Sequence, residues 1–185
     1  MKSKIKNEFG FTLIELMVAM TITIIIGAAM LASFRTGEKR KRIALASDTI
    51  TNVVRSAQTY ALAGKNTNNA NQACRLPQFY FVGFDLSNNT RITLNAQNNC
   101  GTTDLIDTFK LPQNTQMRAN GIVLDGVATS TFYLYFIPPF ADIKAGVDGT
   151  TKASFTTTSI TVEIVGDSAT FKTVNIDGVA GKVGE

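Results

Sequence analysis

Residues 11–34 read FTLIELMVAMTITIIIGAAMLASF and carry one charged side chain, that of Glu15. As a helix with a rise of about 1.5 Å per residue, these 24 residues would cross the hydrocarbon core of a bilayer, which is about 30 Å thick. The stretch is longer than the apolar region of a secretory signal peptide, roughly 7–15 residues, and no A-x-A cleavage site ends it. The sequence therefore predicts a membrane-spanning helix over 11–34.

The positive charge of the chain is concentrated near its start. The 185 residues include 18 Lys+Arg and 14 Asp+Glu, which gives a formal net charge of +4. The segment 1–10 carries +2, the apolar stretch 11–34 carries −1, the segment 35–42 carries +4, and the long segment 43–185 carries −1. Because nucleic acid binds to a basic surface, this distribution argues against nucleic acid as a partner of the larger part of the chain.

The residue types present exclude several kinds of chemistry. The chain has no His, which excludes His-based acid–base catalysis, and its two Cys cannot form a four-thiolate metal site alone. No P-loop motif occurs, and Gly166–Thr170 lacks the spacing of a nucleophile elbow. Asp142 and Asp148 lie in a segment, 141–150, without calcium-loop spacing, so we interpret them as solvated turn carboxylates. We expect no catalytic residue, no cofactor, no metal site and no enzyme activity.

A specific motif precedes the apolar stretch. A short leader with three lysines ends at Gly10, and the hexapeptide FTLIEL of residues 11–16 follows it. This arrangement resembles the cleavage and methylation motif of type IV prepilins and type II secretion pseudopilins. In that family a membrane-bound prepilin peptidase cuts after the glycine and methylates the new first residue. The resemblance implies a leader peptide over 1–10, cleavage after Gly10, methylation of Phe11 and a role for Glu15 in filament assembly.

Glu15 is the unusual residue of the apolar stretch. A carboxylate at the centre of a bilayer costs about 2.5–3.5 kcal/mol, so such residues tend to face a partner. One interpretation is that Glu15, four residues into the stretch, reaches the membrane interface. The interpretation that we favour pairs Glu15 with the free amine that cleavage creates on Phe11 of a neighbouring subunit. Other pilin or pseudopilin subunits are then its partners, and the pair sets the axial register while the apolar helices bundle.

A basic cluster, which we call the collar, follows the apolar stretch. It consists of Arg35, Lys39, Arg40, Lys41 and Arg42. We interpret the collar as a solvated surface that meets the phosphate head groups of cytoplasmic membrane lipids, or acidic neighbours in a filament. The alternative is a contact with nucleic acid, which a single basic run on a packed helix does not favour.

The charges alone do not settle how the chain is oriented. The leader lysines favour a cytoplasmic N-terminus, whereas the collar would then lie outside, against the positive-inside rule. The family resemblance implies a single-pass protein of the cytoplasmic membrane with its N-terminus inside. The same resemblance implies that the subunit later joins a periplasmic or extracellular filament.

The helix is predicted to continue past the membrane to residue 63. Over 35–63 the apolar residues recur at helical spacing on one face, and Gly64 is a suitable residue for the end of the helix. The residues on this face are Ile43, Ala46, Ile50, Val53, Val54, Ala57 and Ala61. An Asn-rich loop over 64–76 then leads to the rest of the chain.

The residues from 77 to 185, which we call the head, have the pattern of β-structure. The fold class is therefore α+β, with a long N-terminal helix and an antiparallel head of one sheet or two. The predicted strands are 78–86, 91–96, 105–111, a short one at Met117, 122–124, 132–137, Phe155, 159–165, 169–176 and a final strand or tail over 179–183. Phe132–Ile137 is almost wholly apolar, and we expect Tyr133 and Phe136 to lie in the core.

Cys74 and Cys100 are the two cysteines of the chain. A head outside the cytoplasmic membrane would lie in a compartment that permits disulfides. The two residues then either form a bridge, which we favour, or remain as free buried thiols.

The family resemblance also bears on the kind of subunit. Many major pilins have a disulfide near the C-terminus, and this chain has no Cys beyond Cys100. The late hairpin and the tail are similar to those of the minor pseudopilin H group, so we expect a minor pilin or pseudopilin. Some members bind DNA through a Gly-Arg-x-Arg tail, whereas this tail, GKVGE over 181–185, has one basic residue. The alternatives are a tip subunit for adhesion or DNA uptake, a major pilin, and a membrane-anchored domain that never polymerises.

Overall fold

The computed structural model describes residues 12–67, 69–147, 152–179 and 181–184. The predicted leader and its junction with Phe11 lie outside these residues. The chain divides into two compact units, Met1–Glu38 and Lys39–Glu185. One helix, α1 (Leu13–Ala63, 51 residues), continues from the first unit into the second.

In the first unit, α1 is apolar on all sides between Glu15 and Arg35. Its large apolar side chains are exposed, from Leu13 at 79% through Ile24 at 70% to Phe34 at 75%. A helix with no polar face has no side suited to water, so it requires an apolar environment. By length and composition α1 can cross a membrane.

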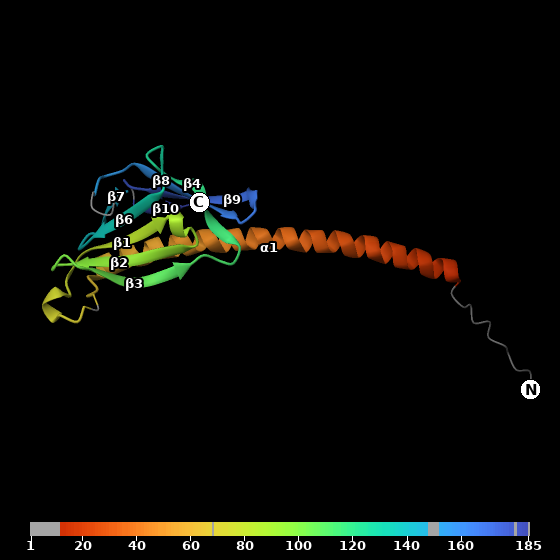
Figure 1. Ribbon diagram of the computed structural model, residues 1–185, viewed down its shortest axis with the longest axis horizontal. Helices are drawn as coiled ribbons and strands as arrows, with labels where there is room; N and C mark the ends of the chain where they lie inside the picture. Colours follow the sequence, from red (N-terminus) through yellow and green to blue (C-terminus); the bar gives the residue numbers. More distant parts are fainter. Residues whose placement is uncertain (1–11, 68, 148–151, 180, 185) are drawn as a thin grey trace, which may run out of the picture. The chain divides into compact units, whose positions relative to one another are not determined.

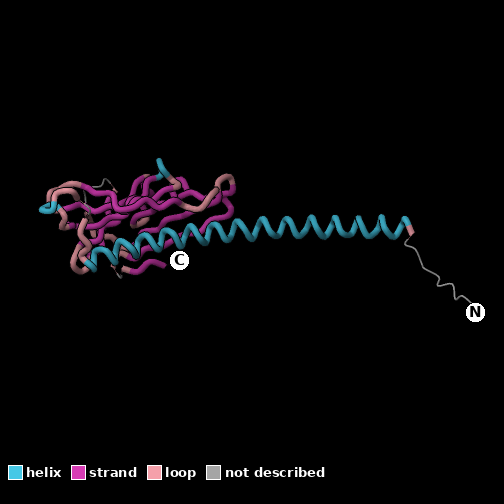
Figure 2. Tube along the Cα trace, turned by 90° about the horizontal axis from the view of Figure 1, so that it is seen from below, coloured by secondary structure: helices cyan, strands magenta, loops and turns pink. Residues whose placement is uncertain are grey.

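In the second unit, α1 is amphipathic and packs against the head. Figures 1 and 2 show this part of the helix running alongside the strands. All seven residues of the predicted apolar face are at most 5% exposed. Three of them are alanines (Ala46, Ala57, Ala61), whose small side chains let the helix lie close to the strands.

The helix ends in a Schellman motif. Gly64 adopts a φ of 58°, in the left-handed region that glycine tolerates best. Its N–H donates to the carbonyl of Ala61 at 3.3 Å, and the N–H of Lys65 donates to the carbonyl of Tyr60 at 3.2 Å. Because this pattern satisfies the last helical carbonyls, the helix stops at the residue that the sequence predicts.

The head consists of two antiparallel five-stranded sheets, which confirms the α+β prediction (Figure 1). The first sheet has the order β3-β2-β1-β6-β7, and the second has the order β10-β9-β8-β4-β5. The strands of the first sheet are β1 (Pro77–Asp85), β2 (Arg91–Asn98), β3 (Thr103–Lys110), β6 (Thr131–Ile137) and β7 (Asp142–Gly146). Those of the second are β4 (Thr115–Leu124), β5 (Val127–Thr129), β8 (Thr157–Ile164), β9 (Asp167–Asp177) and β10 (Lys182–Gly184). Two short 3-10 turns, η1 (Gln72–Cys74) and η2 (Leu86–Asn88), lie on either side of β1.

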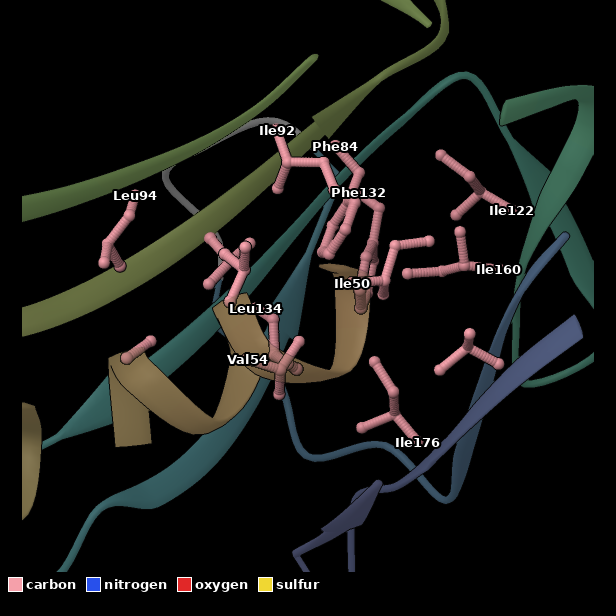
Figure 3. Close-up of a cluster of buried hydrophobic side chains, with 14 of the residues drawn as sticks. Ile50, Val54, Phe84, Ile92, Leu94, Ile122, Phe132, Leu134, Ile160 and Ile176 are labelled. Atoms are coloured by element: carbon pink, nitrogen blue, oxygen red, sulfur yellow. The ribbon is translucent and has the colours of Figure 1, made fainter. Parts of the chain in front are cut away.

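The core lies where α1 meets both sheets. Figure 3 shows Ile50 and Val54 of the helix among side chains of the first sheet, such as Phe84 and Leu134, and of the second sheet, such as Ile160. These residues are at most 1% exposed. The helix therefore acts as a third layer that both sheets share.

Strand β6 is buried over most of its length, as its apolar sequence predicts. Phe132, Leu134 and Phe136 point into the core and are fully buried. Tyr133 lies on the opposite face of the strand and is half-buried, so the expectation that it joins the main core is wrong. The alternation of a strand places neighbouring residues on opposite faces, and the outer face carries its own group of aromatic rings.

The predicted strands at Met117 and at 122–124 are one strand, β4. The register with β8 shifts between Met117 and Ile122, which indicates a bulge. Asn120 adopts a φ of 57°, and a Cβ on Gly121 would lie 2.8 Å from the carbonyl oxygen of Arg118. The polar residues of this bulge interrupt the apolar pattern without ending the strand.

Strands β5 and β7 were not predicted. Asp142 begins β7, where it pairs with Ile137 of β6. The interpretation of Asp142 as a residue of a turn is therefore wrong, because the segment 141–150 is a strand over 142–146. Asp148 lies outside the described residues. Phe155, predicted as a strand residue, is buried but belongs to no strand. In β7 the pairing with β6 overrides the weak intrinsic β-preference of residues 142–146.

Candidate functional site

The start of α1 is closed by a reciprocal pair of side chains, Thr12 and Glu15. The backbone N–H of Thr12 donates to Oε2 of Glu15 at 3.0 Å, and the Thr12 hydroxyl donates to the same oxygen at 2.9 Å. The N–H of Glu15 lies 3.3 Å from Oγ1 of Thr12. This arrangement is a capping box, which satisfies amides that have no partner within the helix.

The capping box holds Glu15 at the very beginning of the apolar helix. Its nearest neighbours on the same face are the apolar side chains of Val18, Ala19 and Ile22, which line a shallow surface groove beside the carboxylate. No described residue donates to the second carboxylate oxygen, Oε1. Gly10 and Phe11, the predicted processing residues, lie outside the described residues.

Two of the five collar residues contact the head. Nζ of Lys39 lies 2.5 Å from Oδ2 of Asp167, at the turn between β8 and β9. A guanidinium nitrogen of Arg42 donates to the carbonyl of Gln113 at 3.2 Å, in the loop between β3 and β4. The hydrogen bond from Lys39 holds the pKa of Asp167 below its usual value. The collar residues Arg35, Arg40 and Lys41 are exposed. Part of the collar, Lys39 and Arg42, therefore connects the helix to the head.

The structure contains a disulfide between Cys74 and Cys100, whose Cα atoms are 5.3 Å apart. It joins the loop after α1 to the turn between β2 and β3. Asn99 supports the same connection, because its side chain donates to the carbonyl of Ala73 at 2.8 Å and its N–H donates to the carbonyl of Leu76 at 2.9 Å. The bridge therefore fixes the Asn-rich loop against the first sheet.

Replacing both cysteines by serine should lower the free energy of unfolding by about 3 kcal/mol, the chain-entropy cost for a loop of this size. Urea unfolding of the full chain in non-ionic detergent micelles measures the effect. Wild-type protein after reduction is the matched control and should lose a similar amount. Equal stability of the oxidised wild type and the double variant would show that the bridge contributes nothing.

The C-terminal tail does not present a basic surface. In the pairing of β10 with β9, Lys182 lies opposite Asp177, and Gly184 lies opposite Asn175. The single basic residue of the tail therefore has an acidic residue as its cross-strand neighbour. This arrangement gives no support to DNA binding, which requires several cations that face phosphates.

Among the described residues, no group of three or more Cys, Asp or Glu could hold a metal ion. The features that relate to the predicted function are the helix start, the apolar surface of the helix and the collar. Sequence reasoning missed one residue of this set, Thr12. Its signal was present, because T-x-x-E at residues 12–15 has the spacing of a capping box.

The comparisons with known proteins agree with the motif at the start of the chain. A family model described as the prokaryotic N-terminal methylation motif matches residues 5–31, 27 of the 185 residues. A search of curated proteins and a search of solved structures find no match. The matched segment contains the leader junction, Glu15 and most of the apolar stretch. This motif, with the long apolar helix and the disulfide-linked head, indicates a type IV pilin- or pseudopilin-like subunit.

Proposed function

We propose that the chain is a filament subunit that is cleaved after Gly10, methylated on Phe11 and assembled through its N-terminal helix. The observation that carries the proposal is the methylation motif placed directly on a helix that is apolar all round. Before assembly, lipid would cover this surface, with the N-terminus of the chain in the cytoplasm. After assembly, the helices of neighbouring subunits would cover it. The work of the protein is then assembly, not catalysis.

Glu15 and Phe11 direct this assembly in our proposal. Cleavage leaves a positive amine on Phe11, and a cation among apolar helices needs a carboxylate partner. Within its own chain, Oε2 of Glu15 accepts the hydrogen bonds of the helix cap, and Oε1 accepts none from the described residues. Oε1 can therefore accept a hydrogen bond from another donor. One carboxylate can thus cap its own helix and accept the amine of a neighbouring subunit.

We further propose that the subunit is a minor one. The observation in favour is the position of the disulfide, which joins the loop after α1 to the β2–β3 turn and leaves the C-terminal strands unbridged. The share of this chain in a sheared filament fraction is the measurement that separates a minor subunit from a major one.

Co-expression with a prepilin peptidase should shorten the chain by the leader and add a methyl group to the new N-terminus. Intact-mass spectrometry of the membrane fraction measures both changes. Gly10→Val should block cleavage, because the resemblance requires the small residue at the cut. Gly27→Ala is the matched control, since a Cβ at that helical position meets nothing within 4 Å. A full-length wild-type chain in the presence of the peptidase would instead indicate a membrane-anchored domain that never polymerises.

A further inference from the structure

Two cations face each other at one end of the first sheet. Arg91 is the first residue of β2, Lys110 is the last residue of β3, and the two are direct cross-strand partners. Both residues are exposed. Like charges directly opposite each other on neighbouring strands destabilise a sheet. The pair therefore has an unfavourable interaction that an anion would remove.

These two residues line a pocket of about 370 Å³. The other wall residues come from the β3–β4 loop, from the start of β4 at Thr115, from Thr90 and from Val165, and none of the described wall residues is acidic. Among the described residues, neither Arg91 nor Lys110 forms an ion pair with a carboxylate. The pocket thus combines two positive side chains with neutral hydrogen-bonding groups, such as those of Thr90 and Asn114.

The collar adjoins the same pocket. Gln113 belongs to the pocket wall, and its carbonyl accepts the hydrogen bond from Arg42. Arg42 lies eight positions after Phe34, the end of the apolar stretch, so the chain between them cannot exceed about 28 Å even when fully extended. The pocket is therefore next to the collar, the part of the chain that follows the predicted membrane span.

We propose that this pocket binds a phosphate group between Arg91 and Lys110. A guanidinium offers paired donors that match two phosphate oxygens, and an ammonium adds a compact positive charge. A phosphate fits a pocket of this volume, and its charge would offset the repulsion of the cross-strand pair. Phospholipid head groups and free inorganic phosphate share this chemistry. The inference goes beyond the filament role and can hold or fail independently of it.

The test uses the full chain in non-ionic detergent micelles, with inorganic phosphate added at constant ionic strength against sodium chloride. We expect a saturable rise in melting temperature with phosphate. In Arg91→Gln/Lys110→Gln the apparent affinity should fall about tenfold or more, as expected when hydrogen bonds to a charged group are lost. Without phosphate, this variant should melt at or above the wild-type temperature, because the like-charge repulsion is gone.

Arg55→Gln/Lys144→Gln is the matched control, since it removes the same charge from residues that do not line the pocket. It should retain the phosphate response of the wild type. A second arm compares lipid nanodiscs made of phosphatidylglycerol with nanodiscs made of phosphatidylcholine. A response to anionic lipid that Arg91→Gln/Lys110→Gln lacks, with none to free phosphate, would support the site and assign it to head groups. A response that persists in this variant, or no response in either arm, would overturn the proposal.

Discussion

Glu15→Gln should lower the association constant of the subunits by about a hundredfold or more while leaving the chain folded and processed. Removing one member of a buried ion pair costs about 3–5 kcal/mol, because the other charge stays buried without a partner. Each 1.4 kcal/mol corresponds to a factor of ten in an equilibrium constant. The measurement is the fraction of the chain in sheared filaments at matched expression, together with the intact mass that shows cleavage.

The choice of glutamine separates the helix cap that the structure shows for Glu15 from the pairing with Phe11 of a neighbouring subunit that we propose. Glutamine can replace glutamate in a capping box, so the start of α1 should remain closed. Thr12→Val is the complementary variant, because it removes the hydroxyl that takes part in the cap and keeps the carboxylate. Loss of that cap costs about 1 kcal/mol of helix stability. We expect Thr12→Val to assemble much better than Glu15→Gln.

Equal assembly of Glu15→Gln and the wild type would rule out the charge pair. A stronger defect in Thr12→Val than in Glu15→Gln would assign the role of Glu15 to the cap alone. In that case the carboxylate would act within its own chain, and another contact would have to set the register between subunits.

The long helix was the most predictable part of the fold. Its first part has an apolar composition over more than six turns, and its second part has apolar residues at helical spacing that end before Gly64. Both signals are local in the sequence, and they agree with each other along one continuous element. The helix therefore ends at Ala63, the predicted residue.

Strands that depend on distant partners were less predictable. β7 has the sequence DIKAG, which has little β-preference. It forms because its backbone pairs with that of β6 in an antiparallel register. The two predicted pieces of β4 are joined across the bulge at Asn120 and Gly121, where the pairing with β8 holds the chain on both sides. A sequence pattern records which residues are apolar, but it does not record which strand lies next to which.

The same limit applies to the candidate sites. Gly10, Phe11, Glu15 and the collar could be proposed from the sequence because the family motif and the charges are consecutive in it. The contact of Lys39 with Asp167 joins residues 128 positions apart, and only the folded structure brings them together. The pairing of Arg91 with Lys110 likewise depends on the register between two strands.

Phe136→Ala should destabilise the head by about 3–5 kcal/mol, the usual cost of removing a large aromatic side chain from a core. Phe136 is fully buried and belongs to the cluster that α1 shares with both sheets. This loss is a large part of the roughly 5–15 kcal/mol that stabilises a typical domain. The chain has no Trp, so Tyr fluorescence during urea unfolding of the full chain in detergent micelles is a suitable measurement.

Tyr133→Ala is the matched control, because Tyr133 lies on the same strand with its ring on the other face. That ring is half-buried and contacts Phe81 edge to face, with 6.0 Å between the ring centroids. An aromatic contact of this kind contributes about 1 kcal/mol. The ratio of the two losses therefore reports which face of β6 carries the core. Equal losses would contradict the placement of Tyr133 outside the main core, because they would give the half-buried ring the same weight as the fully buried one.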